Sequence, residues 1–217
     1  MPEFFKSIIP GLPNRLVAGA LDFLCFFSII PKRKRKKHLE SNPEHVFDGF
    51  IESQSELKDM RFGSTDMAYA GCEIIAVYNL FKAAGINKEL SALIYRFERR
   101  GAVLNGRFGT SPYALYRYLK KEGLDAVRSI RRKDFDKIAS ECSSFIITMY
   151  NDSKNIFEQV HTVCVTKDEE GKLVMHNCGR RDVHYESLEA LEKGAGKEGR
   201  ARIFFIAGIP EKKQMGE

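Results

Sequence analysis

The spacing of the apolar residues changes near residue 142, and this change constrains the fold of the 217-residue chain more than any other feature. Before that point apolar residues recur at helical intervals, as in Leu90, Leu93, Ile94 and Phe97. After it, four runs have the length and composition of strands, at 144–150, 161–167, 172–177 and 202–207. Helices first and a mainly antiparallel sheet second predict an α+β domain, with a further helix over 185–193.

The helical half divides at glycine, proline and capping residues. A polar helix is expected over 41–60, with one apolar stripe made by Val46, Phe47, Phe50 and Ile51. Residues 61–71 then form a loop. Further helices are expected from Cys72 to Gly85, from a cap at Asn87 to Phe97, from Pro112 to Gly123, and over 133–141.

Length and composition predict one core with an appendage. The 43% hydrophobic and 29% charged content is that of an ordinary globular protein. We therefore expect an N-terminal arm over 1–40 and a single domain over 41–217. The five cysteines are odd in number and form no CxxC pair, which favours a reducing compartment over a disulfide framework.

The basic charge of the chain is local. Residues 1–40 carry eight Lys or Arg and three acidic residues, whereas the remaining 177 residues carry 27 basic and 26 acidic ones. A nucleic-acid-binding domain would spread its basic residues over a folded face, so we expect no nucleic-acid partner.

The arm joins an apolar run, 16–30, to six consecutive basic residues, 32–37, through Pro31. Fifteen helical residues reach about 22 Å, short of the roughly 30 Å hydrocarbon core, and Asp22 interrupts the run. A basic cluster beside an apolar helix is attracted to anionic lipid, so Leu16–Lys37 is expected to lie on or re-enter the cytoplasmic membrane surface. The alternative is a helix that packs on the domain, followed by a solvated basic linker.

Cys72 is the candidate nucleophile. It follows Gly71 at the start of an apolar helix, where unpaired N–H groups and the helix dipole favour the thiolate. His161 begins a strand-like run and Asn177 ends the next one, so a hairpin could bring a base and an orienting amide to the cysteine. Pairing His161 with Asn177, and Val163 with Met175, leaves one face of this hairpin apolar. Without these partners, Cys72 would be read as a buried structural cysteine.

Four segments in this order resemble the papain-like fold. They are Gly71-Cys72 with the helix to Gly85, Gly109-Thr110-Ser111-Pro112, the run 145–152, and His161-Thr162-Val163-Cys164-Val165 with Asn177. Over residues 60–208 the chain is similar to the bacterial peptidases related to the bacteriocin leader-processing (double-glycine) family. This resemblance implies a thiol peptidase acting on a peptide or protein, with Cys72 as nucleophile, His161 as base and Asn177 as orienting residue.

The sequence departs from the family at one position. The family has a glutamine about six residues before the nucleophile, whose amide donates to the oxyanion, and this chain has Asp66 there. An ionised carboxylate cannot donate, so the Cys72 N–H with Ser64 or Thr65 would have to serve. Gly71 and Tyr113, which lies where a peptide groove could run, complete the candidate substrate residues.

Three other functions stay open on these residues. Asp66 favours a degenerate, non-catalytic domain that binds peptide or leader segments. The same triad could instead perform amidase or acyl-transfer chemistry. The arm could also make the chain a scaffold subunit of a larger complex. The sequence contains no cofactor motif. The spacing of Cys164, His176, Cys178 and His184 matches no standard zinc site, so neither a metal nor a cofactor is expected.

Overall fold

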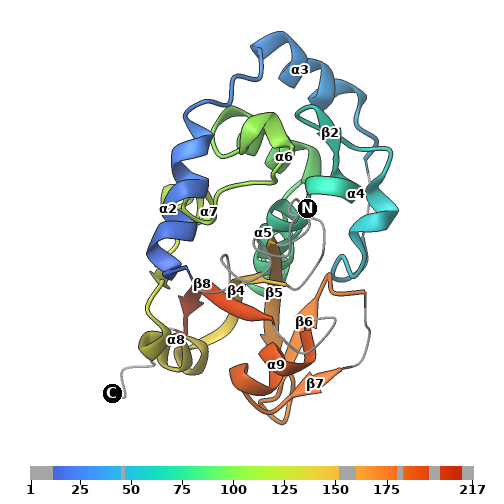
Figure 1. The fold of residues 1–217 in the computed structure, drawn as a ribbon. Coiled ribbons are helices and arrows are strands. Elements are labelled where there is room, and N and C mark those ends of the chain that lie inside the picture. The colour runs from blue at the N-terminus through green and yellow to red at the C-terminus, as the bar shows by residue number, and fades with distance from the viewer. Residues whose placement is uncertain (1–11, 45–46, 152–159, 180–182, 196–200, 212–217) are drawn as a thin grey trace.

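The computed structural model describes residues 12–44, 47–151, 160–179, 183–195 and 201–211. The α+β class is confirmed, because the helices of the first half lie over a sheet built by the second half (Figure 1). The six strands are ordered β3-β8-β4-β5-β6-β7, and every neighbouring pair is antiparallel. Their bounds are β3 Val127–Ser129, β4 Cys142–Tyr150, β5 Val160–Lys167, β6 Leu173–His176, β7 His184–Tyr185 and β8 Arg202–Pro210.

The helices are α2 Asn14–Cys25, α3 Lys32–Ser41, α4 Met67–Ala70, α5 Cys72–Ala83, α6 Leu90–Arg99, α7 Pro112–Lys121, α8 Phe135–Glu141 and α9 Leu188–Ala195. Short 3₁₀ turns cover Gln54–Leu57, Leu104–Gly106 and Arg132–Asp134, and a small hairpin joins β1 Arg61–Phe62 to β2 Thr65–Asp66. The strands β3 and β7 and this hairpin were not predicted from the sequence; each is two or three residues long, too short for an apolar period to show.

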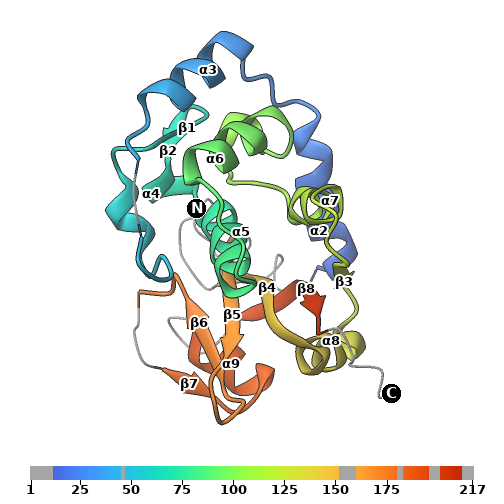
Figure 2. The ribbon, with the colours of Figure 1, turned by 180° about the vertical axis from the view of Figure 1, so that it is seen from behind.

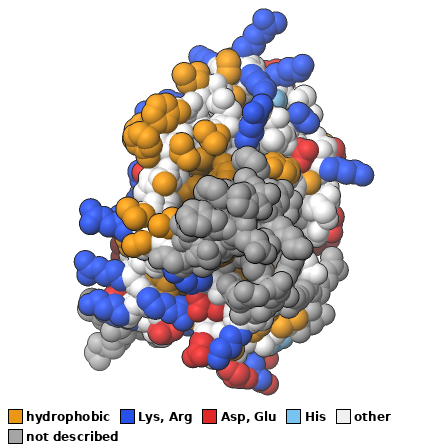
Figure 3. Space-filling model, viewed as in Figure 1, with side chains coloured by type: hydrophobic (Ala, Val, Ile, Leu, Met, Phe, Trp, Pro, Cys, Tyr) orange, Lys and Arg blue, Asp and Glu red, His pale blue; other side chains and the backbone are white. Residues whose placement is uncertain are grey.

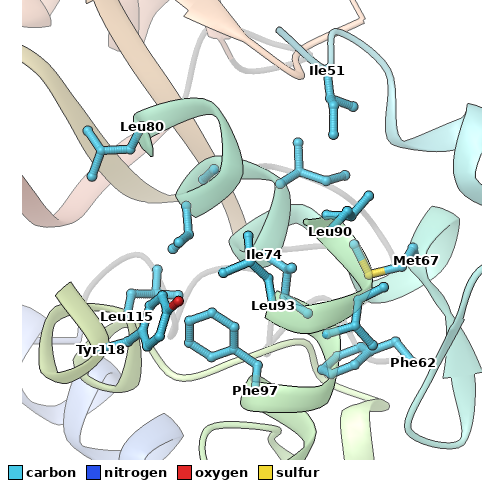
Figure 4. Close-up of a cluster of buried hydrophobic side chains, with 14 of the residues drawn as sticks. Ile51, Phe62, Met67, Ile74, Leu80, Leu90, Leu93, Phe97, Leu115 and Tyr118 are labelled. Carbon is cyan, nitrogen blue, oxygen red and sulfur yellow. The ribbon is translucent and has the colours of Figure 1, made fainter. Parts of the chain in front are cut away.

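Helix α5 is the centre of the molecule. It packs along β5, with α6 and α7 on its other sides (Figures 1 and 2). Ile74 lies among Leu93, Phe97 and Leu115 in the main apolar cluster (Figure 4). A second cluster on the other face of the sheet is covered by α8 and α9. Because α5 is buried along most of its length, its first residue, Cys72, is held in place by the core itself.

The helix expected over 41–60 does not form. Val46 lies outside the described residues, and from residue 47 to residue 53 the chain is not helical; only Gln54–Leu57 makes a 3₁₀ turn. The Asn79 side chain of α5 accepts from the Ile51 N–H at 2.9 Å and donates to the Ile51 carbonyl at 3.0 Å. A side chain thus satisfies both backbone groups that a helix would have paired internally, and an extended strap results.

The β5–β6 hairpin has the predicted faces but not the predicted register. Val165 pairs with Met175 and Lys167 with Leu173, two residues away from the register that would set His161 opposite Asn177. Because side chains alternate with a period of two, a two-residue shift leaves the apolar set on the same face. The five residues between Lys167 and Leu173 form the turn, closed by two backbone hydrogen bonds between Asp168 and the residues 171 and 172.

Helix α6 begins three residues later than the predicted cap at Asn87. Its N-cap is Glu89, and Lys88 just before it forms an ion pair with Glu122 at 2.6 Å. The residues predicted to face inward, from Leu90 to Phe97, are buried as expected. The displaced start therefore changes the cap but not the face that packs.

Both halves of the arm contact the body. Ala18 and Leu21 of α2 are buried against Phe204 and Phe205 of β8. The basic run is a helix, α3, and not a linker; its His38 pairs with the buried Glu98 of α6 at 2.5 Å. Within the described residues, no helix has both the length and the apolar character needed to cross a membrane.

Candidate active site

Gly71 sets the geometry at the start of α5. It is at once the C-cap of α4 and the N-cap of α5, and a Cβ there would lie 2.4 Å from the Met67 carbonyl oxygen. Only glycine permits this close approach of two helix ends. The turn between them places Cys72 at the first helical position with 7% of its surface exposed.

The Cys72 thiol is bonded to a carboxylate. Its Sγ donates to Oε2 of Glu73 at 3.2 Å. Burial raises the pKa of Cys72 well above its usual value, and the charge of Glu73 raises it further; the Thr162 backbone N–H acts in the opposite direction. The lowered thiol pKa expected at a helix N-terminus is therefore outweighed in this resting arrangement.

His161 is held by a backbone carbonyl. Its Nε2 lies 2.9 Å from the main-chain oxygen of Asn177. A carbonyl only accepts, so Nε2 carries the proton and the neutral ring keeps Nδ1 as an acceptor. Burial lowers the pKa of His161, and the Asn177 carbonyl offsets part of this. The ring is therefore neutral near pH 7 and able to take up a proton at Nδ1.

The side chain of Asn177 has a different partner. Its Oδ1 accepts from the Gln54 N–H at 2.8 Å, and its Nδ2 donates to Oε1 of Gln54 at 3.3 Å. Asn177 adopts the left-handed conformation, with φ of 64°, which turns its carbonyl toward His161. The residue predicted to orient the histidine does contact it, but through the main chain and not through the predicted amide.

The start of α5 brings Cys72 against the main chain of β5, next to His161 in the sequence. The Thr162 N–H that acts on the Cys72 sulfur belongs to the residue directly after His161. Among the described residues, the thiol's side-chain hydrogen bond goes to Glu73, and none joins it to the His161 ring. The structure thus brings the predicted nucleophile beside the strand of its predicted base, with Glu73 holding the thiol proton.

The chain has weak structural similarity to a known peptidase domain. No protein-family model and no curated protein matches the chain. Among solved structures, the chain is similar to the peptidase domain of Streptococcus ComA, a bifunctional ABC transporter involved in a quorum-sensing pathway. That match has 14% identity, a TM-score of 0.43, and covers 65% of this chain and 91% of the other.

The oxyanion candidates before the helix have structural partners. Asp66 caps α4 by accepting from the Tyr69 N–H at 2.9 Å. The Ser64 hydroxyl donates to the Asn105 carbonyl at 3.2 Å, and the Thr65 hydroxyl to the Phe62 carbonyl at 3.1 Å. The carboxylate at the position of the family's glutamine therefore serves as a helix cap.

Tyr113 lies on α7, where its ring packs edge-on against Phe205 at 5.7 Å. The Arg128 guanidinium sits 4.5 Å from the same ring. Both contacts are with β8 and β3, on the arm side of the molecule.

Glu73 directly follows Cys72, where a carboxylate is expected to complement the helix dipole and not to take part in chemistry, but the structure places it against the thiol. It is 2% exposed, and a Cβ at Gly109 would lie 2.7 Å from its Oε2. Burial raises the pKa of Glu73 to about 7, although its contacts with Cys72 and the Thr110 N–H act to lower it. The glycine-punctuated loop before α7 was visible in the sequence, but nothing there indicated that it makes room for a carboxylate.

Gln54 is a second residue that the sequence did not single out. Besides its bonds to Asn177, its Nε2 donates to the Ala68 carbonyl of α4 at 2.7 Å. It therefore links the turn before Cys72 to the residue that holds His161. The sequence did not indicate this role, because in the helix predicted over 41–60 Gln54 would have been one of several exposed polar residues.

His176 and His184 have partners away from Cys72. His176 contacts Glu52 at 2.7 Å and Thr166 at 2.8 Å, and His184 pairs with Asp168. In the parts of the chain that the structure describes, no three His, Cys, Asp or Glu side chains are grouped to hold a metal ion.

Proposed function

We propose that the chain is a cysteine peptidase that cleaves a peptide bond through Cys72, His161 and Asn177. The observation that carries this proposal is the tautomer of His161: Nε2 donates to the Asn177 carbonyl, so Nδ1 remains available for the thiol proton. Thiol activation requires a base close to the sulfur, and the N–H of Thr162, the residue directly after His161, acts on the Cys72 sulfur. Cleavage of a peptide bond, rather than of another amide or a thioester, rests on the resemblance to the double-glycine peptidases.

The proposed reaction begins with the transfer of the Cys72 proton to Nδ1 of His161. The sulfur then attacks the scissile carbonyl carbon, and the Cys72 backbone N–H, which the helix leaves unpaired, faces the oxyanion. The imidazolium returns its proton to the leaving amine, and a thioester remains on Cys72. Water, deprotonated by His161, hydrolyses the thioester and restores the thiol.

Substrate has to displace Glu73 for this reaction to start. In the resting arrangement the thiol proton faces Oε2 of Glu73, and a carboxylate beside the sulfur opposes thiolate formation. Rotation of the Cys72 side chain toward His161 on substrate binding removes this contact. The resting enzyme is accordingly expected to be a slow nucleophile.

The same contact supports a second candidate, a non-catalytic domain that binds peptide segments. Under that proposal Glu73 keeps Cys72 protonated permanently, and Asp66 caps α4 without any oxyanion role. An amidase or acyltransferase would use the same sulfur and the same base, and differs from a peptidase only in its substrate.

Site-resolved alkylation separates the catalytic proposals from the binding proposal. Iodoacetamide labelling of Cys72 is followed by mass spectrometry against pH, with half-buried Cys178 as an internal reference. A catalytic site predicts an inflection below the free-thiol pKa of about 8.5 once a substrate-like peptide is bound, and loss of that inflection in His161→Ala. If no peptide in a cleavage library is cut and the inflection never appears, the binding domain is the better account.

We further propose that Leu16–Lys37 rests on an anionic cytoplasmic membrane surface. On the outer side of this segment, Phe23, Phe27 and Ile29 are 60%, 61% and 78% exposed. In Figure 3, hydrophobic side chains gather on the side of the molecule where α2 lies, with Lys and Arg side chains next to them. Apolar side chains flanked by Lys and Arg are typical of interfacial segments.

A further inference from the structure

A positively charged cleft lies between α2, α6 and α7. It encloses about 630 Å³, and its charged lining residues are Asp22, Arg96, Arg99, Arg100, Arg117 and Lys121. Five cations and one carboxylate leave a formal excess of four positive charges. This concentration is notable because residues 41–217 together carry only one net positive charge. A local excess of this kind creates a potential that attracts anions.

Part of this charge is already paired. Both terminal nitrogens of Arg117 bond to Asp22, at 3.0 and 2.7 Å, and Arg96 lies over the Tyr118 ring at 5.8 Å from its centroid. Arg99 and Arg100 are exposed, and neither forms an ion pair with another described residue. The N–H groups of two adjacent guanidinium groups can donate hydrogen bonds to the oxygens of one phosphate group.

The rim of the cleft is apolar. Phe26 lines it and is 80% exposed, as the first residue of the turn that leads to Ile29. This turn is held rigidly, because the Cys25 thiol donates to the Gly101 carbonyl at 3.0 Å and the Asn105 N–H donates to the Ser28 hydroxyl at 2.9 Å. The backbone is thus fixed in a conformation that holds Phe26 out in water.

We propose that this cleft binds the phosphate headgroup of an anionic phospholipid while Phe26 enters the adjoining acyl region. At a bilayer surface the phosphates and the first methylenes lie side by side, as do the arginines and Phe26 here. A soluble anion would use the arginines but not the exposed phenylalanine. The inference rests on the proposed membrane contact of Leu16–Lys37, and adds to it a defined site that α6 and α7 build outside that segment.

The test is sedimentation of the full chain with vesicles of phosphatidylcholine, with and without phosphatidylglycerol. The cleft variant is Arg99→Glu/Arg100→Glu. Its control, Lys133→Glu/Lys137→Glu, makes the same charge change in the 3₁₀ turn Arg132–Asp134 and in α8, which lies below α2 and α7 in Figure 1. Thermal unfolding of each variant verifies that it is folded.

We expect the wild type to partition onto the anionic vesicles only. One basic residue near the surface contributes about fivefold in partitioning, so losing two should weaken binding by about 25-fold, and reversing them by more. The control is expected to stay within about threefold of the wild type, since neither Lys133 nor Lys137 lines the cleft. Phe26→Ser should weaken vesicle binding as well, and leave any binding of inorganic phosphate unchanged.

The outcomes distinguish lipid binding by the cleft from membrane contact by Leu16–Lys37. If Arg99→Glu/Arg100→Glu binds like the control whereas Lys36→Glu/Lys37→Glu in α3 does not bind, the cleft is not the headgroup site, although the arm still contacts the membrane. If the wild type ignores anionic vesicles, both membrane proposals are wrong. If Phe26→Ser binds vesicles normally and inorganic phosphate competes for the cleft, the site takes a soluble anion, which overturns the lipid assignment. None of these results bears on Cys72 alkylation.

Discussion

The sulfur of Cys72 and the carboxylate of Glu73 lie 3.2 Å apart, and both side chains are buried. Both occupy the first turn of α5, where the helix dipole favours negative charge. Placing two negative charges side by side in a buried site costs much free energy. The carboxylate of Glu73 and the thiolate of Cys72 therefore compete for the same helix end. An ionised Glu73 therefore opposes ionisation of the thiol beside it.

Replacing Glu73 with Gln should make the thiol more reactive. The substitution removes a buried negative charge while keeping the shape of the side chain, so the pKa of Cys72 should fall. Alkylation of Cys72 near neutral pH should then accelerate about tenfold. The measurement is the rate against pH for wild type and Glu73→Gln, with Cys178 as reference; an unchanged Cys72 profile would show that the carboxylate does not restrain the thiol.

The same carboxylate should make stability depend on pH. The pKa of Glu73 is raised from 4.5 to about 7 in the folded protein, so the folded state binds the proton more tightly than the unfolded state. The resulting stabilisation is fully present below about pH 4.5 and is lost as pH rises through 7, by an amount on the order of 3 kcal/mol. Urea unfolding of wild type and Glu73→Gln across this window should diverge as pH rises, in favour of the variant; parallel curves would contradict the shifted pKa.

Asn177 should tolerate glycine better than alanine. Either substitution removes the two side-chain bonds to Gln54, but only alanine also has to place a Cβ at φ of 64°. We therefore expect Asn177→Ala to be less stable than Asn177→Gly by about 1 kcal/mol, measured by urea unfolding. Because His161 is bound by the main chain, Asn177→Gly should also retain the pH profile of Cys72 alkylation. A profile as altered as that of His161→Ala would mean that the side-chain amide orients the ring after all.

Gly71→Ala should disrupt the junction between α4 and α5. The added Cβ would meet the Met67 carbonyl oxygen at 2.4 Å and the Met67 side chain at 2.7 Å, so one helix has to move. We expect a loss of about 2 kcal/mol or more in the free energy of unfolding. Gly19→Ala in α2 is the matched control, since nothing lies within 4 Å of its Cβ position, and it should be neutral or stabilising by up to about 1 kcal/mol. Equal effects at the two glycines would contradict the close packing at Gly71.

The elements with a strong apolar period were predictable. Cys72 does begin a helix, Pro112 does lie at the first position of α7, and the four apolar runs are β4, β5, β6 and β8. The segment 41–60 failed because its apolar residues fit a helical stripe, whereas Asn79 holds Ile51 in an extended strap. The spacing of apolar residues cannot reveal a hydrogen-bond partner that lies on another helix. Nor can it reveal a register shift of two residues, because such a shift leaves every side chain on the same face of the sheet.

The sequence alone determined the longer strands, the helices with a strong apolar period and the apolar faces of both. It also placed a cysteine, a histidine and an asparagine at element ends, because these features depend on near neighbours along the chain. Only the tertiary structure decided what each polar group bonds to. It assigned the Asn177 carbonyl to His161, the Asn177 amide to Gln54, and the thiol of Cys72 to Glu73 in the space that Gly109 leaves. Buried polar groups have to find partners wherever the fold supplies them, and those partners can lie more than a hundred residues away.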